Sequence, residues 1–261
     1  MFVKINTSSP VPVVVVVAAL LLTTAAVACS PGTCRNNSLP FNKYAFLTTH
    51  NAFAVEGEPY HTGVPRITLT NQEDTVTQQL NKPAVDTLKE IESFLRTNPS
   101  EIVTLFLQDY VQTPKGISKV LREAGLSKYR FPLSRMPRNG EDWPTVTHML
   151  ATNQRLLVFT SVQSKEKSEG IAYQWNYMVE NQYGDDGMIA GSCTNRMESS
   201  ALNDKRKSLV LMNYFGSIPS KKFACVYNSA NLLAMIRTCH QATGGRWPNF
   251  VAVDFYKVVI T

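Results

Sequence analysis

The sequence LTTHNAF at residues 47–53 places a histidine and an amide directly after an apolar, strand-like run that begins at Tyr44. Histidine has the unperturbed side-chain pKa nearest neutrality, so it suits proton transfer. In α/β enzymes, catalytic side chains are commonly found where a strand ends and a loop begins. We therefore interpret His50 as a catalytic base at a strand end; the alternative is a histidine satisfied within the core.

The first 28 residues have the three parts of a secretory signal peptide. Lys4 supplies a charge, residues 13–22 form an apolar core, and a small-residue cleavage site ends at Ala28. A signal anchor is the alternative, although the apolar run is short for a membrane span. We expect a secreted chain, in the cell wall or at the outer face of the plasma membrane. The residues after Tyr256 do not form a tail typical of a GPI anchor.

The length that remains favours one large domain with a sizeable core. We expect residues 29–38 to form a short cysteine-containing segment and residues 39–261 to form the domain. The formal charge of +6 favours anionic partners. For an exported protein these are lipid headgroups or cell-wall acids, and we expect no nucleic-acid partner. Because the basic residues are scattered, the alternative is that the charge serves only solubility. A monomer is expected.

Five cysteines are expected to pair in an oxidising compartment, and the odd number leaves at least one without an intrachain partner. Three of them lie in the second half of the chain, at Cys193, Cys225 and Cys239. The plausible bridges join Cys225 to Cys239, or either of these to Cys193. The sequence leaves that choice open.

Apolar strand-like runs alternate with helical patterns, which favours a parallel sheet or a barrel. Strands are predicted at residues 44–49, 101–107, 155–161, 208–215 and 249–255, with a possible sixth at 171–179. Helices are predicted at residues 83–97, 117–124, 145–151 and 228–240. Eight strands are needed for a closed (β/α) barrel, and the shortage is greatest between residues 49 and 101.

A series of short motifs runs along most of the chain. The first are LPFNKY at 39–44, THNAF at 49–53, EIVT at 101–104 and EDWP at 141–144. They continue with RLLVFTS at 155–161, YQWNYMVEN at 173–181, LMNYF at 211–215 and NFVAVDFY at 249–256. Taken together and in order, they resemble the plant secreted proteins with a phosphatidylinositol-specific phospholipase C X-like domain, of the PLC-like phosphodiesterase superfamily.

The resemblance implies a TIM-type (β/α) barrel that cleaves a phosphodiester, such as a phosphoinositide at a membrane surface. His50 matches the histidine that takes a proton from the attacking hydroxyl, and a second histidine protonates the leaving oxygen. An arginine or a calcium ion offsets the charge on the phosphoryl oxygens. Asn51 matches an oxygen ligand of the metal-using relatives. Gln108 stands where many relatives have a glutamate ligand, and its neutral amide makes calcium binding doubtful.

The resemblance also implies that a block is missing after Asn81. Relatives continue there through a strand with an arginine and acidic residues to a loop that bears the second histidine, whereas this chain passes directly to the helix expected at Pro83. His61 is interpreted as a loop residue, and His148 and His240 as structural residues. We therefore expect an incomplete barrel whose phosphodiesterase activity is impaired. The alternatives are an inactive extracellular headgroup-binding or scaffold protein and a non-functional splice variant.

Four further residues are candidates for supporting the site. Asp254 ends the last predicted strand and could hold His50 in one tautomer, or act as a helix cap or ion-pair partner. Asp109 could supply a carboxylate, but alternation along its strand predicts that it points to the opposite face. Trp175 and Tyr177 either line the substrate cleft or pack in the core.

Overall fold

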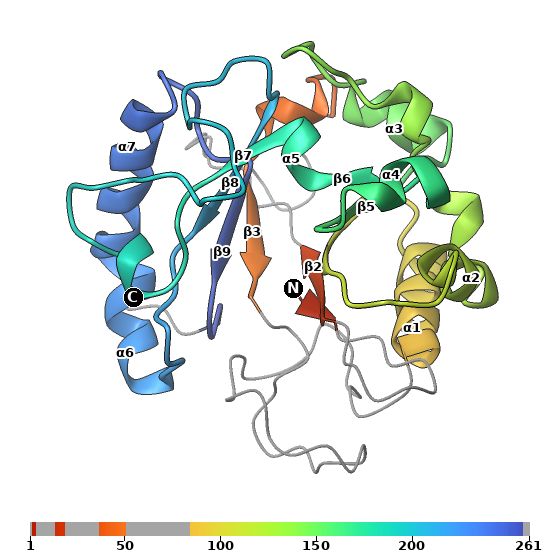
Figure 1. Cartoon of the computed structure of the whole chain (residues 1–261), viewed down its shortest axis with the longest axis horizontal. Helices are drawn as coiled ribbons and strands as arrows, with labels where there is room; N and C mark the ends of the chain where they lie inside the picture. Colours follow the sequence, from red (N-terminus) through yellow and green to blue (C-terminus); the bar gives the residue numbers. More distant parts are fainter. Residues whose placement is uncertain (1, 4–13, 19–36, 51–83, 258–261) are drawn as a thin grey trace, which may run out of the picture.

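The computed structural model describes residues 2–3, 14–18, 37–50 and 84–257 of the chain. Strands occupy the centre and helices lie around them (Figure 1). The strands form two sheets, one of five strands and one of four. All pairings within the four-stranded sheet are parallel. The fold is therefore mixed α/β, with parallel pairing throughout the four-stranded sheet and between β4, β5 and β6, as the alternation of apolar runs predicts.

The five-stranded sheet has the order β1-β2-β4-β5-β6. Its strands are β1 (Phe2–Val3), β2 (Val14–Ala18), β4 (Val103–Gln108), β5 (Leu156–Thr160) and β6 (Ala172–Tyr173). The four-stranded sheet has the order β3-β9-β8-β7. Its strands are β3 (Phe46–Thr49), β7 (Met178–Glu180), β8 (Leu209–Asn213) and β9 (Phe250–Val253).

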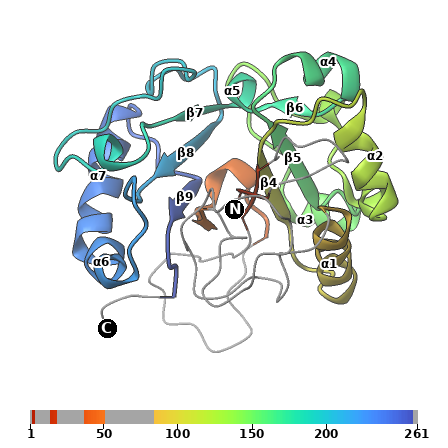
Figure 2. The ribbon, with the colours of Figure 1, turned by 60° about the horizontal axis from the view of Figure 1, so that its bottom comes forward.

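Helices cover the outer side of each sheet (Figure 2). Beside β4, β5 and β6 lie α1 (Ala84–Thr97), α2 (Gly116–Glu123), α3 (Val146–Ala151) and α4 (Ser164–Glu169). On the other side, α6 (Lys221–Val226) and α7 (Leu232–Ala242) lie beside β8 and β9. The short helix α5 (Gln174–Tyr177) connects the two sheets between β6 and β7. No helix among the described residues has the length and apolar character needed to cross a bilayer.

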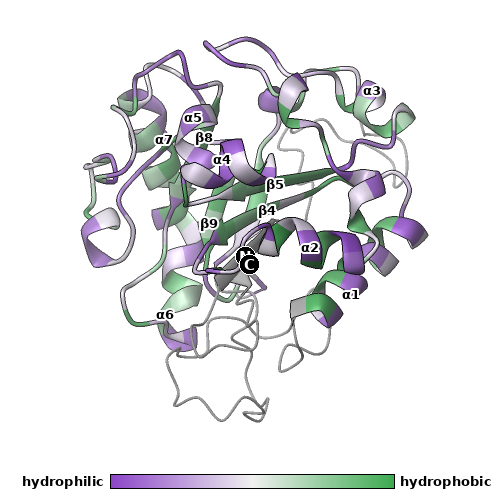
Figure 3. Cartoon of the chain, turned by 45° about the vertical axis from the view of Figure 1, so that its right-hand side comes forward, coloured by the Kyte–Doolittle hydropathy of each residue, from purple (hydrophilic) through white to green (hydrophobic). Residues whose placement is uncertain are grey.

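The hydrophobic core follows the apolar periodicity of the sequence. Leu88, Ile91 and Leu95 share one face of α1 and are buried. Strands β4, β5, β8 and β9 are buried along almost their whole length, as expected for strands covered on both faces. Figure 3 shows these strands as a hydrophobic centre beneath helices of mixed character. Most predicted elements are confirmed to within two or three residues.

Two predicted elements differ from the structure. The strand predicted at residues 171–179 is divided into β6, α5 and β7, so that its two halves belong to different sheets. The helix predicted at 228–240 begins only at Leu232, because Asn228 and Ser229 have non-helical backbone angles. The Asn228 amide donates hydrogen bonds to the carbonyls of Asp254 and Phe255, which compensates for the break.

Strand β2 pairs antiparallel with β4, with Val16 opposite Phe106. Its valines are β-branched, and such residues favour extended backbone. This strand lies inside the segment interpreted as a signal peptide, whose cleavage would remove it from the edge of β4. In the described residues β4 and β3 belong to different sheets. The described strands therefore form two sheets, and the incomplete barrel that the resemblance implied stays a prediction.

Candidate active site

His50 and Asp254 form a polar contact at the ends of β3 and β9. The Nδ1 atom of His50 lies 2.8 Å from Oδ1 of Asp254. The His50 side chain is 15% exposed and that of Asp254 is 8% exposed. A carboxylate only accepts, so Nδ1 carries the proton and Nε2 remains as the basic nitrogen. This arrangement suits a histidine that removes a proton from a substrate.

The register of two parallel strands explains this pair. Thr49 of β3 lies opposite Val253 of β9. The residues that follow these two are His50 and Asp254, so both side chains leave the sheet at the same edge. The His50 amide also donates to the Val253 carbonyl at 2.9 Å. Residues 204 positions apart in the sequence are thus brought together by strand pairing alone.

The ring of Phe215 stacks on one face of the His50 ring. The two rings are stacked, with centroids 3.5 Å apart and planes inclined by 5°. Phe215 is buried and follows β8, the next strand in the same sheet. The imidazole is therefore fixed by a hydrogen bond at its edge and by an aromatic ring on its face, which limits its rotation.

A cavity of about 140 Å³ lies beside His50. Its apolar floor comes from Phe106, Leu211 and Phe215. Its polar and aromatic lining comes from both sheets and the connections between them, and comprises Gln108, Ser161, Gln174, Trp175, Glu180, Tyr183, Arg196 and Asn213. A small cavity with an apolar floor and several convergent polar groups is typical of a site for a small polar ligand.

Glu180 is the centre of the polar lining. This carboxylate is buried and accepts hydrogen bonds from Gln174, Trp175 and Asn213, each at 2.9 Å. Arg196 adds an ion pair at 3.2 Å. A buried carboxylate is stable when it is paired and fully hydrogen-bonded, so this group is a fixed negative charge at the wall of the cavity.

Arg196 supplies the only arginine among the described residues that line the cavity. Its guanidinium forms a two-bonded pair with Glu198 and lies over the rings of Trp175 and Tyr183. Burial opposes its charge, but the carboxylates of Glu180 and Glu198 outweigh that effect and raise the pKa of Arg196. The described contacts use three of its five N–H donors, which leaves donors for a ligand.

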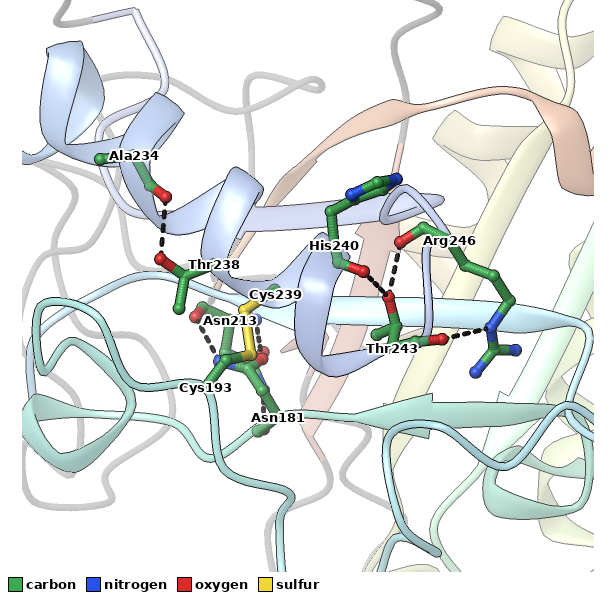
Figure 4. The surroundings of a disulfide bond; sticks show 9 residues. All are labelled: Asn181, Cys193, Asn213, Ala234, Thr238, Cys239, His240, Thr243 and Arg246. Carbon is green, nitrogen blue, oxygen red and sulfur yellow. Dashed lines mark hydrogen bonds between the residues drawn. A yellow bond between two sulfur atoms is a disulfide. The ribbon is translucent and has the colours of Figure 1, made fainter.

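A disulfide fastens the segment that carries Arg196. Cys193 and Cys239 are joined with a Cα–Cα distance of 5.2 Å (Figure 4). The bridge connects the β7–β8 connection to α7, beside the hydrogen-bonded pair Asn181 and Asn213. This is one of the pairings that the sequence left open, and Cys225 retains a free thiol.

Asp109 does not reach the cavity. Its side chain accepts hydrogen bonds from Thr160 at 2.7 Å and from the Val111 amide at 2.9 Å. Lys165 of α4 lies 2.8 Å from it, and both side chains are buried or nearly so. The carboxylate therefore ties β4 to α4 on the side of the strand away from the cavity, which alternation along a strand explains. The structure thus places Asp109 outside the lining of the cavity.

The remaining predicted residues divide between the cavity and the core. Trp175 and Gln108 line the cavity, and Gln108 donates to the hydroxyl of Tyr110. Tyr177 packs in the core and accepts a hydrogen bond from Arg138; burial, with the nearby Glu166, raises its pKa to about 12. Asn51, His61 and the Asn81 junction lie outside the described residues.

The described residues match a calcium site poorly. Calcium requires six to eight oxygen ligands, several of them carboxylates. No cluster of three or more carboxylate, histidine or cysteine side chains with metal-binding geometry occurs in the described part of the chain. Glu180 already binds four donors, and the charged Arg196 lies against it. We therefore derive no reaction step through a metal.

Glu180, Arg196, Asn213 and Phe215 also line the cavity, although they were not predicted from the sequence. Glu180 and Asn213 each end a buried apolar strand, which is the same signal that indicated His50. Arg196 lies in an irregular connection and has no periodic or motif signal. It reaches the cavity through the Glu180 ion pair and the backbone bond from its own amide to the Glu180 carbonyl.

The sequence is similar to known proteins over most of its length. The model of the PI-PLC X 1 family matches residues 66–259. This chain belongs to the PI-PLC X family. A PI-PLC X domain-containing protein of Arabidopsis thaliana is 51% identical in an alignment of 253 positions, which covers 84% of this chain and 59% of the relative. The chain thus spans about three-fifths of that PI-PLC X relative. No solved structure matches this chain.

Proposed function

We propose that this chain carries a phosphodiester site of the phosphatidylinositol-specific phospholipase C type, with His50 as the general base. The observation that carries the proposal is the 2.8 Å contact between His50 and Asp254 beside the cavity. In the proposed reaction, Nε2 of His50 removes the proton from a substrate hydroxyl, which then attacks phosphorus. The Asp254 carboxylate stabilises the imidazolium that forms.

The residues around this site lead us to expect slow turnover. His50 is the only histidine among the described residues that line the cavity, since His148 and His240 lie elsewhere. A leaving oxygen without a general acid departs about a hundredfold or more slowly. Arg196 can donate hydrogen bonds to phosphoryl oxygens, but Glu180 and Glu198 already balance its charge. Stabilisation of the developing negative charge is therefore weak.

We also propose that the two sheets are arcs of a (β/α) barrel that lacks one block. The alignment with the Arabidopsis relative runs over 253 residues, whereas 84% of this 261-residue chain is about 219 residues. The difference of about 34 positions is consistent with a segment that the relative has and this chain lacks. Transcript sequence across the codons for Asn81 and Lys82 tests whether that segment is a skipped exon.

Secretion is part of the same proposal. The disulfide between Cys193 and Cys239 supports folding in an oxidising compartment. Expression of the full chain in plant cells, followed by N-terminal sequencing of the protein in the medium, tests both export and the predicted cleavage after Ala28. Retention of the uncleaved chain inside the cells would contradict this part of the proposal.

The direct test of activity is cleavage of a water-soluble inositol phosphodiester by the purified chain. We expect slow cleavage that His50→Ala abolishes. A matched control is His148→Ala, because His148 contacts Arg135 on the surface and not the cavity. Cleavage that survives in His50→Ala would contradict the role of His50.

The second candidate function is headgroup binding without turnover. It is favoured by the lining of the cavity, where Trp175, Tyr183 and the remaining Arg196 donors offer stacking and hydrogen bonds to a polyhydroxylated ring. Calorimetric titration with myo-inositol 1-phosphate separates the two functions. Saturable binding together with undetectable cleavage would favour binding alone, and no binding would exclude it.

A further inference from the structure

The backbone directly after Asp254 has an unfavourable conformation. Phe255 has a φ of 47°, in the left-handed region that favours glycine, and its side chain is buried. A bulky residue keeps such a conformation only where the surrounding structure enforces it, and residues of this kind are concentrated at functional sites. The turn follows the end of β9, where the chain leaves the sheet. The contacts that enforce the turn therefore also determine where the Asp254 carboxylate points.

The side chain of Asn228 bridges the two carbonyls of this turn. Its amide donates to the Asp254 carbonyl at 2.9 Å and to the Phe255 carbonyl at 3.0 Å. Asn228 is 8% exposed, so both bonds are shielded from water, and they use both N–H donors of the amide. Because one planar amide holds both carbonyls, it restricts rotation of the backbone between them, which includes φ of Phe255.

Asn228 lies at a break between two helices. The chain from α6 to α7 departs from helical geometry at Asn228, with φ −78° and ψ 29°, and at Ser229, with φ −120° and ψ −142°. We call the segment Tyr227–Asn231 the α6–α7 kink. Proline and glycine are common causes of kinks, but neither occurs between Lys221 and Ala242. Side-chain contacts such as those of the Asn228 amide therefore account for the break.

The α6–α7 kink also contacts the strand that supports the face of the His50 ring. The Tyr227 ring lies edge-on to the Tyr214 ring, with centroids 6.4 Å apart. Tyr214 is followed by Phe215, whose ring stacks on His50. Figure 2 shows α6 and α7 beside β8 and β9, the strands that end at Tyr214 and Asp254. Consecutive residues of the kink thus contact the segments that carry both supports of the imidazole.

We propose that Asn228 is a positioning residue for the candidate base. Its amide holds the left-handed turn at Phe255 and thereby directs the Asp254 carboxylate onto His50. Asn228 is not among the described residues that line the cavity, so it acts through Asp254 and not on the substrate. A shift of about 1 Å in a catalytic group lowers a rate by up to a hundredfold, so a support of this kind controls turnover from outside the cavity. The proposal rests on the proposed function only in the role of His50 as the base.

The test is Asn228→Ala, with nitrogen NMR of the His50 imidazole and cleavage of a water-soluble inositol phosphodiester as readouts. We expect the Nδ1 and Nε2 signals of His50 to move toward those of a mixture of tautomers. The kcat should fall about tenfold with little change in KM, because the geometry of the base changes and the cavity lining does not. Unchanged His50 signals and unchanged kcat in the folded variant would overturn the proposal.

Asn228→Gln is the conservative variant. It keeps the amide but displaces it by one methylene, so both readouts should change in the same direction as in Asn228→Ala and by a smaller amount. This variant also keeps the proposal testable if Asn228→Ala fails to fold. In that case, His50 signals identical to those of the wild type in Asn228→Gln would overturn the positioning role.

The matched control is Asn98→Ala, beside the other sheet. The Asn98 amide donates to the Phe94 carbonyl at 2.8 Å, just after α1, so its loss also removes an amide bond to the backbone. We expect this variant to lose stability as Asn228→Ala does, but to keep the His50 signals of the wild type. If Asn98→Ala changes those signals as much as Asn228→Ala, general loosening of the fold explains them and the proposal is overturned.

A double-mutant cycle with Asp254→Asn tests the route of the effect. If Asn228 acts through the Asp254 carboxylate, adding Asn228→Ala to Asp254→Asn should not change the His50 signals further. A further change as large as that of Asn228→Ala in the wild type would show that Asn228 acts by another route, which overturns the proposal.

The two readouts separate this proposal from the proposed function. His50 signals that depend on Asn228 in a chain that cleaves no phosphodiester would support the positioning role and contradict the proposed activity. Cleavage that His50→Ala abolishes, but that Asn228→Ala leaves unchanged together with the His50 signals, would support the proposed activity and overturn the positioning role.

Discussion

The two sheets of this molecule end in buried carboxylates that have different surroundings. Asp109, after β4, is neutralised by Lys165 from α4 and faces away from the cavity. Glu180 and Asp254, at the ends of β7 and β9, face His50 and the cavity lining. All three carboxylates are buried. An acidic residue at a strand end is therefore an ambiguous signal, and the face of the strand together with the neighbouring element decides whether its side chain lies at the cavity.

The largest effect is expected from breaking the ion pair between Asp109 and Lys165. Lys165→Met leaves the Asp109 carboxylate buried without its ion pair, which costs about 3–5 kcal/mol of unfolding free energy. Chemical denaturation measures this loss. The control is Lys167→Met, because Lys167 is exposed on the same helix. A loss below about 1 kcal/mol, or headgroup affinity that falls in the folded fraction, would contradict a purely structural role for this pair.

The next largest effect is expected from removal of the disulfide, which tests whether the bridge positions the segment that carries Arg196. Replacing both Cys193 and Cys239 with serine removes a bridge between residues 46 positions apart, worth about 3 kcal/mol. Because Cys193 lies three residues from Arg196, we also expect affinity for inositol phosphate to fall several-fold. Thermal unfolding and calorimetry measure the two effects. Cys225→Ser, which alters only the free thiol, should change neither.

Asp254→Asn tests whether the Asp254 carboxylate orients His50, with little change in the size of the side chain. An amide in this position no longer favours the Nε2-basic tautomer of His50, so turnover should fall about a hundredfold, with little loss of stability. Nitrogen NMR of the His50 imidazole should report the altered tautomer even where turnover is too slow to follow. Asp204→Asn is the control, since Asp204 pairs with Arg206 at the surface. An unchanged His50 spectrum in Asp254→Asn would refute the orienting role.

The smallest expected effect concerns the contribution of Glu166 to stability at acidic pH. Burial would raise the pKa of Glu166, but hydrogen bonds from the Tyr173 amide, Arg138 and Asn176 outweigh it and lower that pKa below 4.5. A lowered folded-state pKa contributes stability that is present above the unfolded-state pKa and is lost as pH falls through the folded-state pKa. Glu166→Gln should remove about 1 kcal/mol at neutral pH. It should also flatten the decline of stability below about pH 4.5, as measured by denaturation across pH.

Much of the fold was predictable, because buried strands and amphipathic helices follow simple apolar periodicities. The apolar runs of β4, β5, β8 and β9 and the stripe of α1 show this directly. The break between β6 and β7 was not predictable, because apolar and aromatic residues dominate residues 171–179 and only tertiary packing turns Gln174–Tyr177 into a helix. The strand contribution of Val14–Ala18 was hidden by its likeness to a signal sequence.

The sequence predicted the catalytic pair of the candidate site because two strand ends meet there, and it also named Gln108 and Trp175 of the cavity lining. His50 and Asp254 follow recognisable apolar runs, and parallel register brings them together. Arg196 could not be found in this way, because an irregular connection, a disulfide and a buried ion pair place it in the cavity. Side chains that depend on long-range contacts of this kind leave no local pattern in the sequence.

The most direct test uses the three tryptophans as reporters of the cavity, the core and the surface. The Trp175 indole donates to Glu180 in the cavity, the Trp143 indole donates to Ser208 in the core, and Trp247 is exposed. In proton–nitrogen NMR, saturation with myo-inositol 1-phosphate should shift the Trp175 indole signal and leave the other two in place. An unshifted Trp175 signal, or a larger shift at Trp143 or Trp247, would contradict the assignment of this cavity as the functional site.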